Sequence, residues 1–177
     1  MATFIVLDRD GVINEDSDDY IKSPAEWMPI QGSLEAIAHL HQRGVRVAVL
    51  TNQSGIARGL FDQPTLDAIH DKMRAAVRQA GGEITDIFFC PHGPDDGCVC
   101  RKPLPGLFHQ LALRQHIAVD TVYAVGDSYR DLEAAWAVQA KPVLVKTGKG
   151  QKTLKAHPDL LIPVYAHLHE AVLDLYP

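Results

Sequence analysis

The sequence predicts an α/β fold with a central parallel β-sheet. Two observations support this: five short apolar runs rich in β-branched residues recur along the chain, and amphipathic segments with helical spacing separate them. Strands that alternate with helices form parallel sheets whose faces the helices cover. The chain has 177 residues, the usual size for one domain, so we expect residues 1–177 to form a single domain with an ample core.

The strands are predicted from runs of apolar residues that are too short for helices. These runs are FIVL, VRVAVL, DIFFC, TVYAV and PVLVK, at residues 4–7, 45–50, 86–90, 121–125 and 142–146. Between them, apolar residues recur at helical spacing and predict helices that start at Ser33 as N-cap, near 62–64, at Pro105, after Gly126-Asp127 and near 165. Segments 14–31 and 91–104 are expected to be irregular loops, which often carry function.

Composition limits the class of partner. The net charge of −5 gives no general attraction to nucleic acid or to an anionic membrane. Residues 1–11 lack the basic lead and cleavage-like stretch of a signal peptide, and no apolar run approaches membrane-spanning length. The three cysteines all fall between residues 90 and 100, a poor disulfide framework. We therefore expect a cytoplasmic monomer without nucleic-acid or membrane partners.

Polar clusters follow the predicted strands. The carboxyl ends of parallel strands form the ligand crevice of an open sheet, so clusters far apart in sequence can converge there. Each cluster taken alone has an ordinary explanation as a turn, a helix cap or a solvated surface pair, but their order after successive strands favours one shared site. The clusters are Asp8-Arg9-Asp10-Gly11, Thr51-Asn52-Gln53-Ser54-Gly55, Arg101-Lys102-Pro103 and Gly126-Asp127-Ser128 with Asp131.

The acidic clusters predict a divalent cation. Asp8 and Asp10 are two residues apart in extended chain, so their side chains point the same way while Arg9 points aside. Two close carboxylates are costly to ionise together unless a cation lies between them. Asp127 brings another carboxylate to the crevice, and hard oxygen ligands of this kind suit Mg²⁺ better than zinc.

The remaining clusters suit a phosphoryl group. Thr51 offers a hydroxyl, and the residues after it offer side-chain amides and backbone N–H groups at the end of a strand. Arg101 and Lys102 add two fixed cations that can neutralise phosphate oxygens.

A cysteine-rich loop predicts a second metal. Cys90, His92, Cys98 and Cys100 supply three thiolates and one imidazole in two close pairs, which fits the closed tetrahedral set of a structural zinc site. The alternative is three free thiols and an incidental histidine. With four protein ligands no position remains open for catalysis, so we expect Zn²⁺ to hold this loop, and through it Arg101-Lys102, against the site.

The ordered clusters resemble the four motifs of the haloacid dehalogenase superfamily, which Asp8-Arg9-Asp10-Gly11, Thr51, Lys102 and Gly126-Asp127 with Asp131 match. The resemblance implies a Rossmann-like three-layer sandwich with a zinc-binding loop insertion and without a large cap domain. It further implies a phosphatase in which Asp8 is the nucleophile and Asp10 the general acid and base. Mg²⁺ would be held by Asp8, Asp127 and the backbone carbonyl of Asp10, with Asp131 in support. The phosphoryl oxygens would be held by Thr51, Asn52 and Lys102.

Within the superfamily, the cysteine loop that runs into Arg101-Lys102-Pro103 is similar to a branch of heptose bisphosphate and histidinol-phosphate phosphatases. The segments 10–14 and 51–59 and the stretch that ends in Trp27 are similar to the heptose enzymes. The implied reaction removes the C7 phosphate of heptose 1,7-bisphosphate, and its product would feed nucleotide-activated heptose for a bacterial lipopolysaccharide. Histidinol phosphate is the alternative substrate.

A bisphosphate needs a second cation away from the reaction centre. Arg58 or Arg101 could meet the distal phosphate, although Arg58 could equally be a solvated surface charge. We also expect Gln53 and Ser54 to bind this small sugar phosphate.

Two other classes of protein remain as alternatives. A signalling receiver domain also phosphorylates an aspartate beside Mg²⁺, but its acceptor would follow the third strand, where Cys90-Pro-His92 stands. A silent phosphosugar-binding protein would not need a complete set of nucleophile, acid and cation. Other charged residues are expected at the surface, with Lys146, Lys149 and Lys152 as a solvated rim and His39, His41 and His70 on exposed helix faces.

Overall fold

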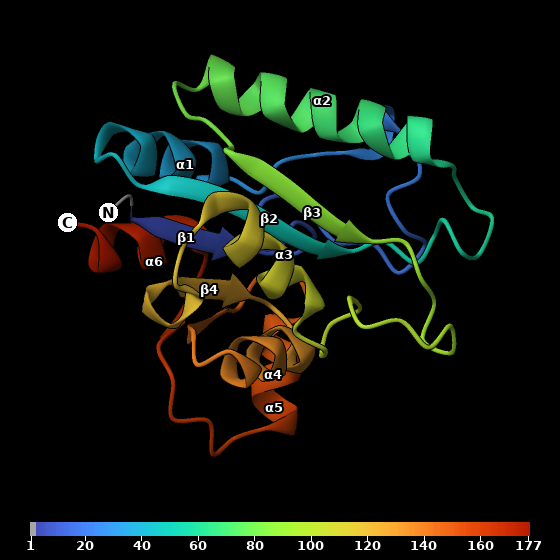
Figure 1. Ribbon diagram of the computed structural model, residues 1–177. Helices are drawn as coiled ribbons and strands as arrows, with labels where there is room; N and C mark the ends of the chain where they lie inside the picture. The colour runs from blue at the N-terminus through green and yellow to red at the C-terminus, as the bar shows by residue number, and fades with distance from the viewer. Residues whose placement is uncertain (1–2) are drawn as a thin grey trace.

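The computed structural model describes residues 3–177, so Met1 and Ala2 of the N-terminal stretch lie outside the described part. Its centre is a six-stranded sheet in the order β3-β2-β1-β4-β5-β6, and every strand pair is parallel (Figure 1). The predicted α/β fold with a central parallel sheet is confirmed. The strands are β1 (Phe4–Leu7), β2 (Arg46–Asn52), β3 (Asp86–Cys90), β4 (Tyr123–Gly126), β5 (Lys141–Val145) and β6 (Val164–Tyr165).

Helices connect the strands and cover both faces of the sheet. The α-helices are α1 (Ser33–Gln42), α2 (Gln63–Gln79), α3 (Gly106–Gln115), α4 (Tyr129–Ala137), α5 (Gly150–Ala156) and α6 (Leu168–Leu175), and two short 3₁₀ turns span Pro24–Glu26 and Val119–Thr121. The sequence did not predict α5 and β6. The strand β6 has two residues, too few for an alternating pattern, and α5 buries only Gly150 and Thr153, so it carries no apolar stripe.

The core lies on both sides of β1. Ile5 and Leu7 pack on one face against α1, α2 and α6, and Phe4 and Val6 pack on the other against α3 and α4. All four residues of β1 are buried, because a central strand of a parallel sheet is covered on both faces. The three layers are visible in Figure 1, where α1 and α2 lie on one side of the sheet and α3 and α4 on the other.

The start of α1 differs from the prediction. Ser33 is the first helical residue rather than the N-cap, and Gly32 precedes it with a φ of 85° in the left-handed region. The Ser33 hydroxyl donates instead to the carbonyl of Val12, at 2.9 Å, in a buried contact. A tertiary partner has taken the serine that the local pattern assigned to capping.

The sheet order reverses on either side of β1. The chain moves from β1 outward through β2 and β3, then returns to β4 on the other side of β1. In open parallel sheets the crevice at such a reversal, beyond the carboxyl ends of the strands, is the usual place for a ligand. The segments that follow β1 and β3 both reach this end of the sheet, as the pocket described below demonstrates. Among residues 3–177, no helix has the length and apolar character required to span a membrane.

Candidate active site

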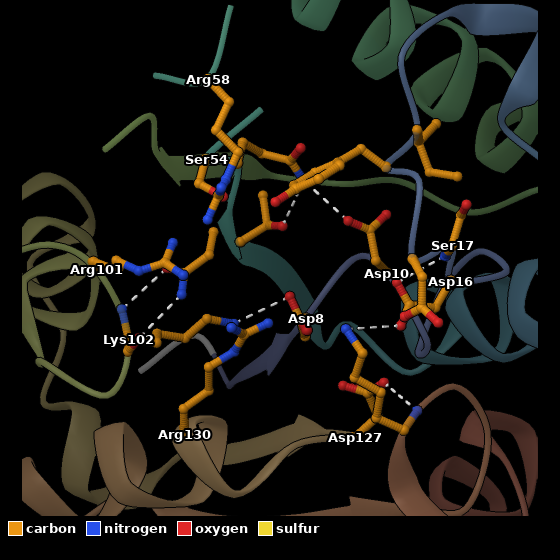
Figure 2. A pocket seen from close by; sticks show the side chains of 17 residues that line it. Asp8, Asp10, Asp16, Ser17, Ser54, Arg58, Arg101, Lys102, Asp127 and Arg130 are labelled. Atoms are coloured by element: carbon orange, nitrogen blue, oxygen red, sulfur yellow. Dashed lines mark hydrogen bonds and ion pairs between the residues drawn. The ribbon is translucent and has the colours of Figure 1, made fainter. Parts of the chain in front are cut away.

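A polar pocket of about 280 Å³ opens at the carboxyl ends of β1, β2 and β4 (Figure 2). In Figure 2, Asp8 lies in the middle, with Ser54, Arg58 and Arg101 on one side of it and Asp10 and Asp16 on the other. The convergence expected from the sheet therefore occurs. The sequence-predicted residues that line the pocket are Asp8, Asp10, Thr51, Asn52, Gln53, Ser54, Arg58, Arg101, Lys102 and Asp127.

Lys102 is the buried cation at the bottom of this pocket. Its Nζ lies 3.1 Å from Asp8 Oδ1 and 2.7 Å from Asp131 Oδ1, and it donates to the carbonyl of Leu50 at 2.7 Å. Its side chain is only 4% exposed. Burial opposes the charge, but the two carboxylates outweigh burial and raise the pKa of Lys102, so the lysine is fully charged.

Asp8 follows β1 directly and is held through one oxygen. Its Oδ1 accepts from the backbone N–H of Arg9 at 2.8 Å and faces Lys102, whereas no residue of the described chain donates to its Oδ2. Burial, helped by the charges of Asp131 and Asp10, outweighs the attraction of Lys102 and raises the pKa of Asp8 to about 6. One carboxylate oxygen of Asp8 is thus available to a substrate.

Asp127 follows β4 and packs against two glycines. A Cβ at Gly11, where φ is 83°, would stand 2.1 Å from Asp127 Oδ2, and a Cβ at Gly148 would stand 2.2 Å from the same atom. The backbone N–H of Lys149 donates to Asp127 Oδ2 at 2.7 Å. Burial and the neighbouring charges of Asp8 and Asp131 raise the pKa of Asp127 to about 8. Asp127 is not the cap of α4, because Ser128 and Asp131 form that capping box.

Asp131 pairs with protein groups through both oxygens. Its Oδ1 contacts Lys102, and its Oδ2 accepts from the backbone N–H of Ser128 at 3.0 Å and from the Ser128 hydroxyl at 2.7 Å. Burial would raise its pKa, but Lys102 lowers it below the usual value. The resemblance implied a supporting part for Asp131 at the metal; in the structure its partners are Lys102 and Ser128.

The polar side chains at the end of β2 form hydrogen bonds with other groups of the protein, which their sequence did not indicate. Both amide atoms of Asn52 pair with the backbone of Lys102, each at 3.0 Å, so this side chain positions Lys102. Gln53 Nε2 donates to Thr51 Oγ1 at 3.0 Å and to Asp10 Oδ2 at 3.1 Å. Ser54 is buried at the pocket wall.

Asp10 lies in a network of donors. Asn14 Nδ2 donates to its Oδ1 at 2.9 Å, and the Arg9 guanidinium contacts both of its oxygens. Burial would raise the pKa of Asp10, but the charge of Arg9 and the hydrogen bonds from Arg9, Asn14 and Gln53 together outweigh burial and lower the pKa below its usual value. Arg9 in turn reaches His70 of α2. The prediction of a surface position for His70 is wrong, because its side chain is buried against this pair; His41 is exposed and His39 is half-buried.

The acidic residues fit a divalent cation. One oxygen each of Asp8, Asp127 and Asp131 can be chosen so that all three atoms lie within 4.8 Å of one another. Lys102 pairs with Asp8 and Asp131, and Asp127 adds a third carboxylate beside them, so the ionised cluster holds excess negative charge. The raised pKa values of Asp8 and Asp127 are the electrostatic consequence. An oxygen-coordinated cation such as Mg²⁺ would relieve it.

The cysteine loop gathers the predicted zinc ligands. One ligand atom each from Cys90, His92, Cys98 and Cys100 lies within 4.8 Å of the others. The Sγ atoms of Cys90 and Cys98 are 3.7 Å apart, and His92 Nδ1 is 3.4 Å from Cys100 Sγ. The donor set fits the soft, closed coordination of Zn²⁺. The loop then leads directly into Arg101, whose guanidinium donates to the carbonyl of His92 at 3.3 Å.

Several lining residues were not singled out from the sequence. Arg130 is the second residue of α4, next to Asp131, and only the fold brings it to the pocket. Lys149, predicted as part of a solvated rim, lines the pocket and forms an ion pair with Asp16 at 3.3 Å. For the residues of segment 14–31, the sequence offered one signal, the length of the segment. That length indicated an insertion but did not indicate which of its residues line the pocket. Its pocket residues are Asp16, Ser17, Asp18, Tyr20 and Ile21.

Comparison with known proteins agrees with this geometry. A family model described as HAD-hydrolase-like matches residues 99–171. The D-glycero-beta-D-manno-heptose-1,7-bisphosphate 7-phosphatase of Bordetella bronchiseptica is 59% identical over 85% of this chain and 84% of that protein. The protein of the same name from Neisseria meningitidis is 51% identical over 96% of this chain and 90% of that protein. The chain belongs to the haloacid dehalogenase-like hydrolase family.

A solved structure supports the family at the level of the whole fold. The D,D-heptose 1,7-bisphosphate phosphatase of B. bronchiseptica, in complex with magnesium and phosphate, matches with a TM-score of 0.95 and 52% identity. The match covers 98% of this chain and 97% of that one. The receiver-domain alternative is disfavoured, because the pocket aspartate Asp8 of this chain follows β1, whereas Cys90 ends the third strand.

The raised pKa of Asp127 gives a testable dependence of stability on pH. A folded-state pKa of about 8 against a usual value of 3.8 means that the folded chain holds a proton that the unfolded chain releases. The free energy of unfolding therefore falls as pH rises through this window. In chelator-treated protein, Asp127→Asn should raise the melting temperature by several degrees at about pH 8 and change it little at about pH 4.

Differential scanning calorimetry at the two pH values measures this effect. Saturating Mg²⁺ should raise the melting temperature of the wild type at the higher pH and remove the advantage of the variant. An equal difference between wild type and variant at both pH values, without any response to Mg²⁺, would contradict the electrostatic account of the cluster.

Proposed function

We propose that this chain is a Mg²⁺-dependent phosphatase that removes the C7 phosphate of D-glycero-D-manno-heptose 1,7-bisphosphate and releases heptose 1-phosphate. The observation that carries the proposal is the buried arrangement of Asp8, Lys102 and Asp131 at the end of the central strand. The relatives at 51–59% identity are named for this activity on the β-anomer, and the fold matches along nearly the whole chain.

Asp8 is the proposed nucleophile. The Arg9 N–H and Lys102 hold its Oδ1, so Oδ2 attacks phosphorus in line with the bond to the sugar oxygen. The new bond joins Asp8 Oδ2 to phosphorus, and the bond between phosphorus and the C7 oxygen breaks. Asp10 would give a proton to that departing oxygen; because the donors around it lower its pKa in the free pocket, it must take up this proton when the negative charge of the substrate phosphate arrives beside it.

The second half of the reaction regenerates Asp8. Asp10, now a carboxylate, takes a proton from water as the water oxygen attacks the phosphorus of the aspartyl phosphate. The bond between phosphorus and Asp8 breaks, and inorganic phosphate leaves. Asp10 ends protonated, ready for the next substrate.

Charge on the transferred phosphoryl group is balanced by fixed donors. Lys102 lies at hydrogen-bond distance from Asp8, so its ammonium is positioned beside the phosphoryl oxygens, and the Thr51 hydroxyl supplies another donor from the end of β2. The side-chain amide of Asn52 donates to the carbonyl of Lys102 and accepts from its backbone N–H. The amide is thus proposed as a positioning group for Lys102, in place of the direct phosphate contact expected from the sequence.

Asp8, Asp127 and the backbone carbonyl of Asp10 would hold Mg²⁺, with Asp131 in support. The bound ion would supply positive charge to phosphate oxygens and offset the buried carboxylates. The glycines at positions 11 and 148 leave the room that Asp127 occupies, since a Cβ at either position would collide with its Oδ2.

Arginines at the rim of the pocket are the proposed site of the distal phosphate. Arg58 and Arg101 both line the pocket, and Arg130 does so from α4. Burial and the nearby charge of Arg130 lower the pKa of Arg101. The two cations are close enough to repel each other, and a bound anion would relieve that repulsion. The guanidinium of Arg58 stands 5.9 Å from the ring centre of Tyr20, which restricts where it can reach.

Zn²⁺ is the proposed second metal, bound by Cys90, His92, Cys98 and Cys100. Its part would be structural: it would fix residues 90–100 of the cysteine loop, and Arg101 and Lys102 follow these residues directly. We further propose that residues 1–177 act as one domain, as a cytoplasmic monomer whose product serves bacterial lipopolysaccharide synthesis.

The first test is regiospecific hydrolysis. With Mg²⁺, the chain should release phosphate from C7 and leave the C1 phosphate in place, which phosphorus NMR distinguishes. Its kcat/KM should exceed that for histidinol phosphate by on the order of a hundredfold or more. Asp8→Asn should lose turnover by at least about 10³-fold while keeping its melting transition, because the nucleophile is gone.

Two outcomes would contradict the proposal. Faster hydrolysis of histidinol phosphate would overturn the substrate assignment. Full turnover by Asp8→Asn would overturn the nucleophile, whichever substrate is used.

The distal cations are tested by comparing a bisphosphate with its monophosphate. Arg58→Ala and Arg101→Ala should raise the KM for heptose 1,7-bisphosphate by about tenfold, since a charge-assisted hydrogen bond contributes about 1.5–3 kcal/mol. The KM for heptose 7-phosphate, which lacks the distal group, should stay unchanged. Arg114→Ala is the matched control, because that exposed arginine of α3 pairs with Asp86 of β3 and does not line the pocket. Equal increases for both substrates would refute the assignment.

The zinc site is tested by metal analysis and proteolysis. The wild type should contain one zinc per chain, and Cys98→Ser should lose it and expose loop 91–104 to protease. Activity should fall about tenfold or more, because Lys102 lies in the same loop, two residues after the zinc ligand Cys100. A wild type without zinc whose loop still resists protease would rule this site out.

A further inference from the structure

A buried histidine lies behind the proposed catalytic acid. His70 belongs to the buried stripe of α2, whose other members are the apolar Leu66, Ile69, Met73 and Val77. It is 7% exposed, and its ring centre is 6.2 Å from that of Phe89. A core position of this kind is ordinarily apolar, so the polar ring calls for a partner.

That partner is Arg9, which is completely buried. The Arg9 guanidinium makes a fork with the Asp10 carboxylate: Nε lies 2.9 Å from Oδ1, and Nη2 lies 3.1 Å from Oδ2. Its third nitrogen, Nη1, is 3.2 Å from His70 Nε2. Each guanidinium nitrogen therefore has an acceptor, and two of the three belong to Asp10.

The direction of the contact between Arg9 and His70 follows from chemistry. A guanidinium has only donors, so Nη1 donates and His70 Nε2 accepts. The ring must then be neutral and carry its proton on Nδ1. Burial, followed by the positive charges of Arg9 and Arg74, lowers the pKa of His70 to about 3 despite the opposite effect of Asp10, which agrees with a neutral ring.

We propose that His70 is a positioning residue for the proton-transfer step: by accepting from Nη1 it fixes the plane of the Arg9 guanidinium, which fixes the carboxylate of Asp10. The proposal rests on the proposed function in one respect, the acid–base role of Asp10. It adds a residue of α2 that the motifs around Asp8 and Thr51 do not contain.

The geometry favours positioning over simple packing. An aliphatic side chain would fill the site and match the rest of the α2 stripe, without the cost of burying a polar ring beside a cation. Without His70, however, Nη1 of Arg9 would be a buried donor with no acceptor, which is unfavourable unless the guanidinium turns. A turned guanidinium breaks the fork to Asp10.

Leaving groups of different basicity separate proton transfer from other effects. The alkoxide released from glycerol 2-phosphate needs a proton from Asp10, whereas the phenolate released from p-nitrophenyl phosphate leaves without one. The quantity to compare is kcat/KM, which reports the steps up to loss of the leaving group. Damage to Asp8, Lys102 or the metal site would lower both values together.

Three variants differ in whether an acceptor reaches Nη1. His70→Leu removes it, His70→Asn places an amide oxygen one bond too short, and His70→Gln places one at the distance of Nε2. Leu and Asn should lower kcat/KM for glycerol 2-phosphate by about tenfold or more relative to p-nitrophenyl phosphate, and Gln should stay within about threefold of the wild type. His39→Leu is the control, since that half-buried histidine contacts the carbonyl of Tyr176 far from the pocket.

Equal losses for both substrates, or a Gln variant no better than the Asn variant, would overturn the proposal. If His70→Leu does not fold, the comparison of the two amide variants still decides, with melting temperatures measured for each. Failure of the wild type to hydrolyse heptose 1,7-bisphosphate would count against the proposed function alone, because the leaving-group comparison does not use that substrate.

Discussion

The site depends on one buried charge balance at the carboxyl end of the sheet. Lys102 contacts both Asp8 and Asp131, and Asp127 completes a cluster whose negative charge exceeds what the lysine supplies. Lys102 and Asp131 keep their charges because each holds the other, whereas Asp8 and Asp127 have raised pKa values. This asymmetry supports the proposal that a cation would bind at Asp8 and Asp127, with Asp131 in support.

The rest of the fold places the members of this cluster from distant parts of the chain. Asp8 comes from the central strand, Lys102 follows the cysteine loop, and Asp131 lies on the first turn of α4. Asn52 at the end of β2 joins two of these parts, since its amide pairs with the backbone of Lys102. The loop of the proposed zinc ligands would thus help to hold Lys102 in position, although the zinc ligands themselves contribute no group to the reaction centre.

A second buried unit, formed by Arg9, Asp10 and His70, complements the first. In the lysine cluster the cation is surrounded by acids, and in the second unit a guanidinium lies between one carboxylate and one neutral ring. The two aspartates that follow β1 therefore have opposite pKa directions, upward for Asp8 and downward for Asp10. In the chain without a metal these directions are the reverse of those that a nucleophile and a general acid need, so the proposed roles require a cation at Asp8 and a substrate phosphate beside Asp10 to invert them.

The sequence by itself determined five of the six strands, five of the six α-helices and most of the residues that meet at the carboxyl edge of the sheet, because apolar periodicity and the strand-end rule are local signals. Only the tertiary structure decided what each polar group touches. Ser33 donates a hydrogen bond to the carbonyl of Val12 instead of capping α1. Asn52 is hydrogen-bonded to the backbone of Lys102, and His70 is buried against Arg9. A side chain's partner is chosen by elements that pack against it from elsewhere in the chain, and spacing along the sequence carries no record of that packing.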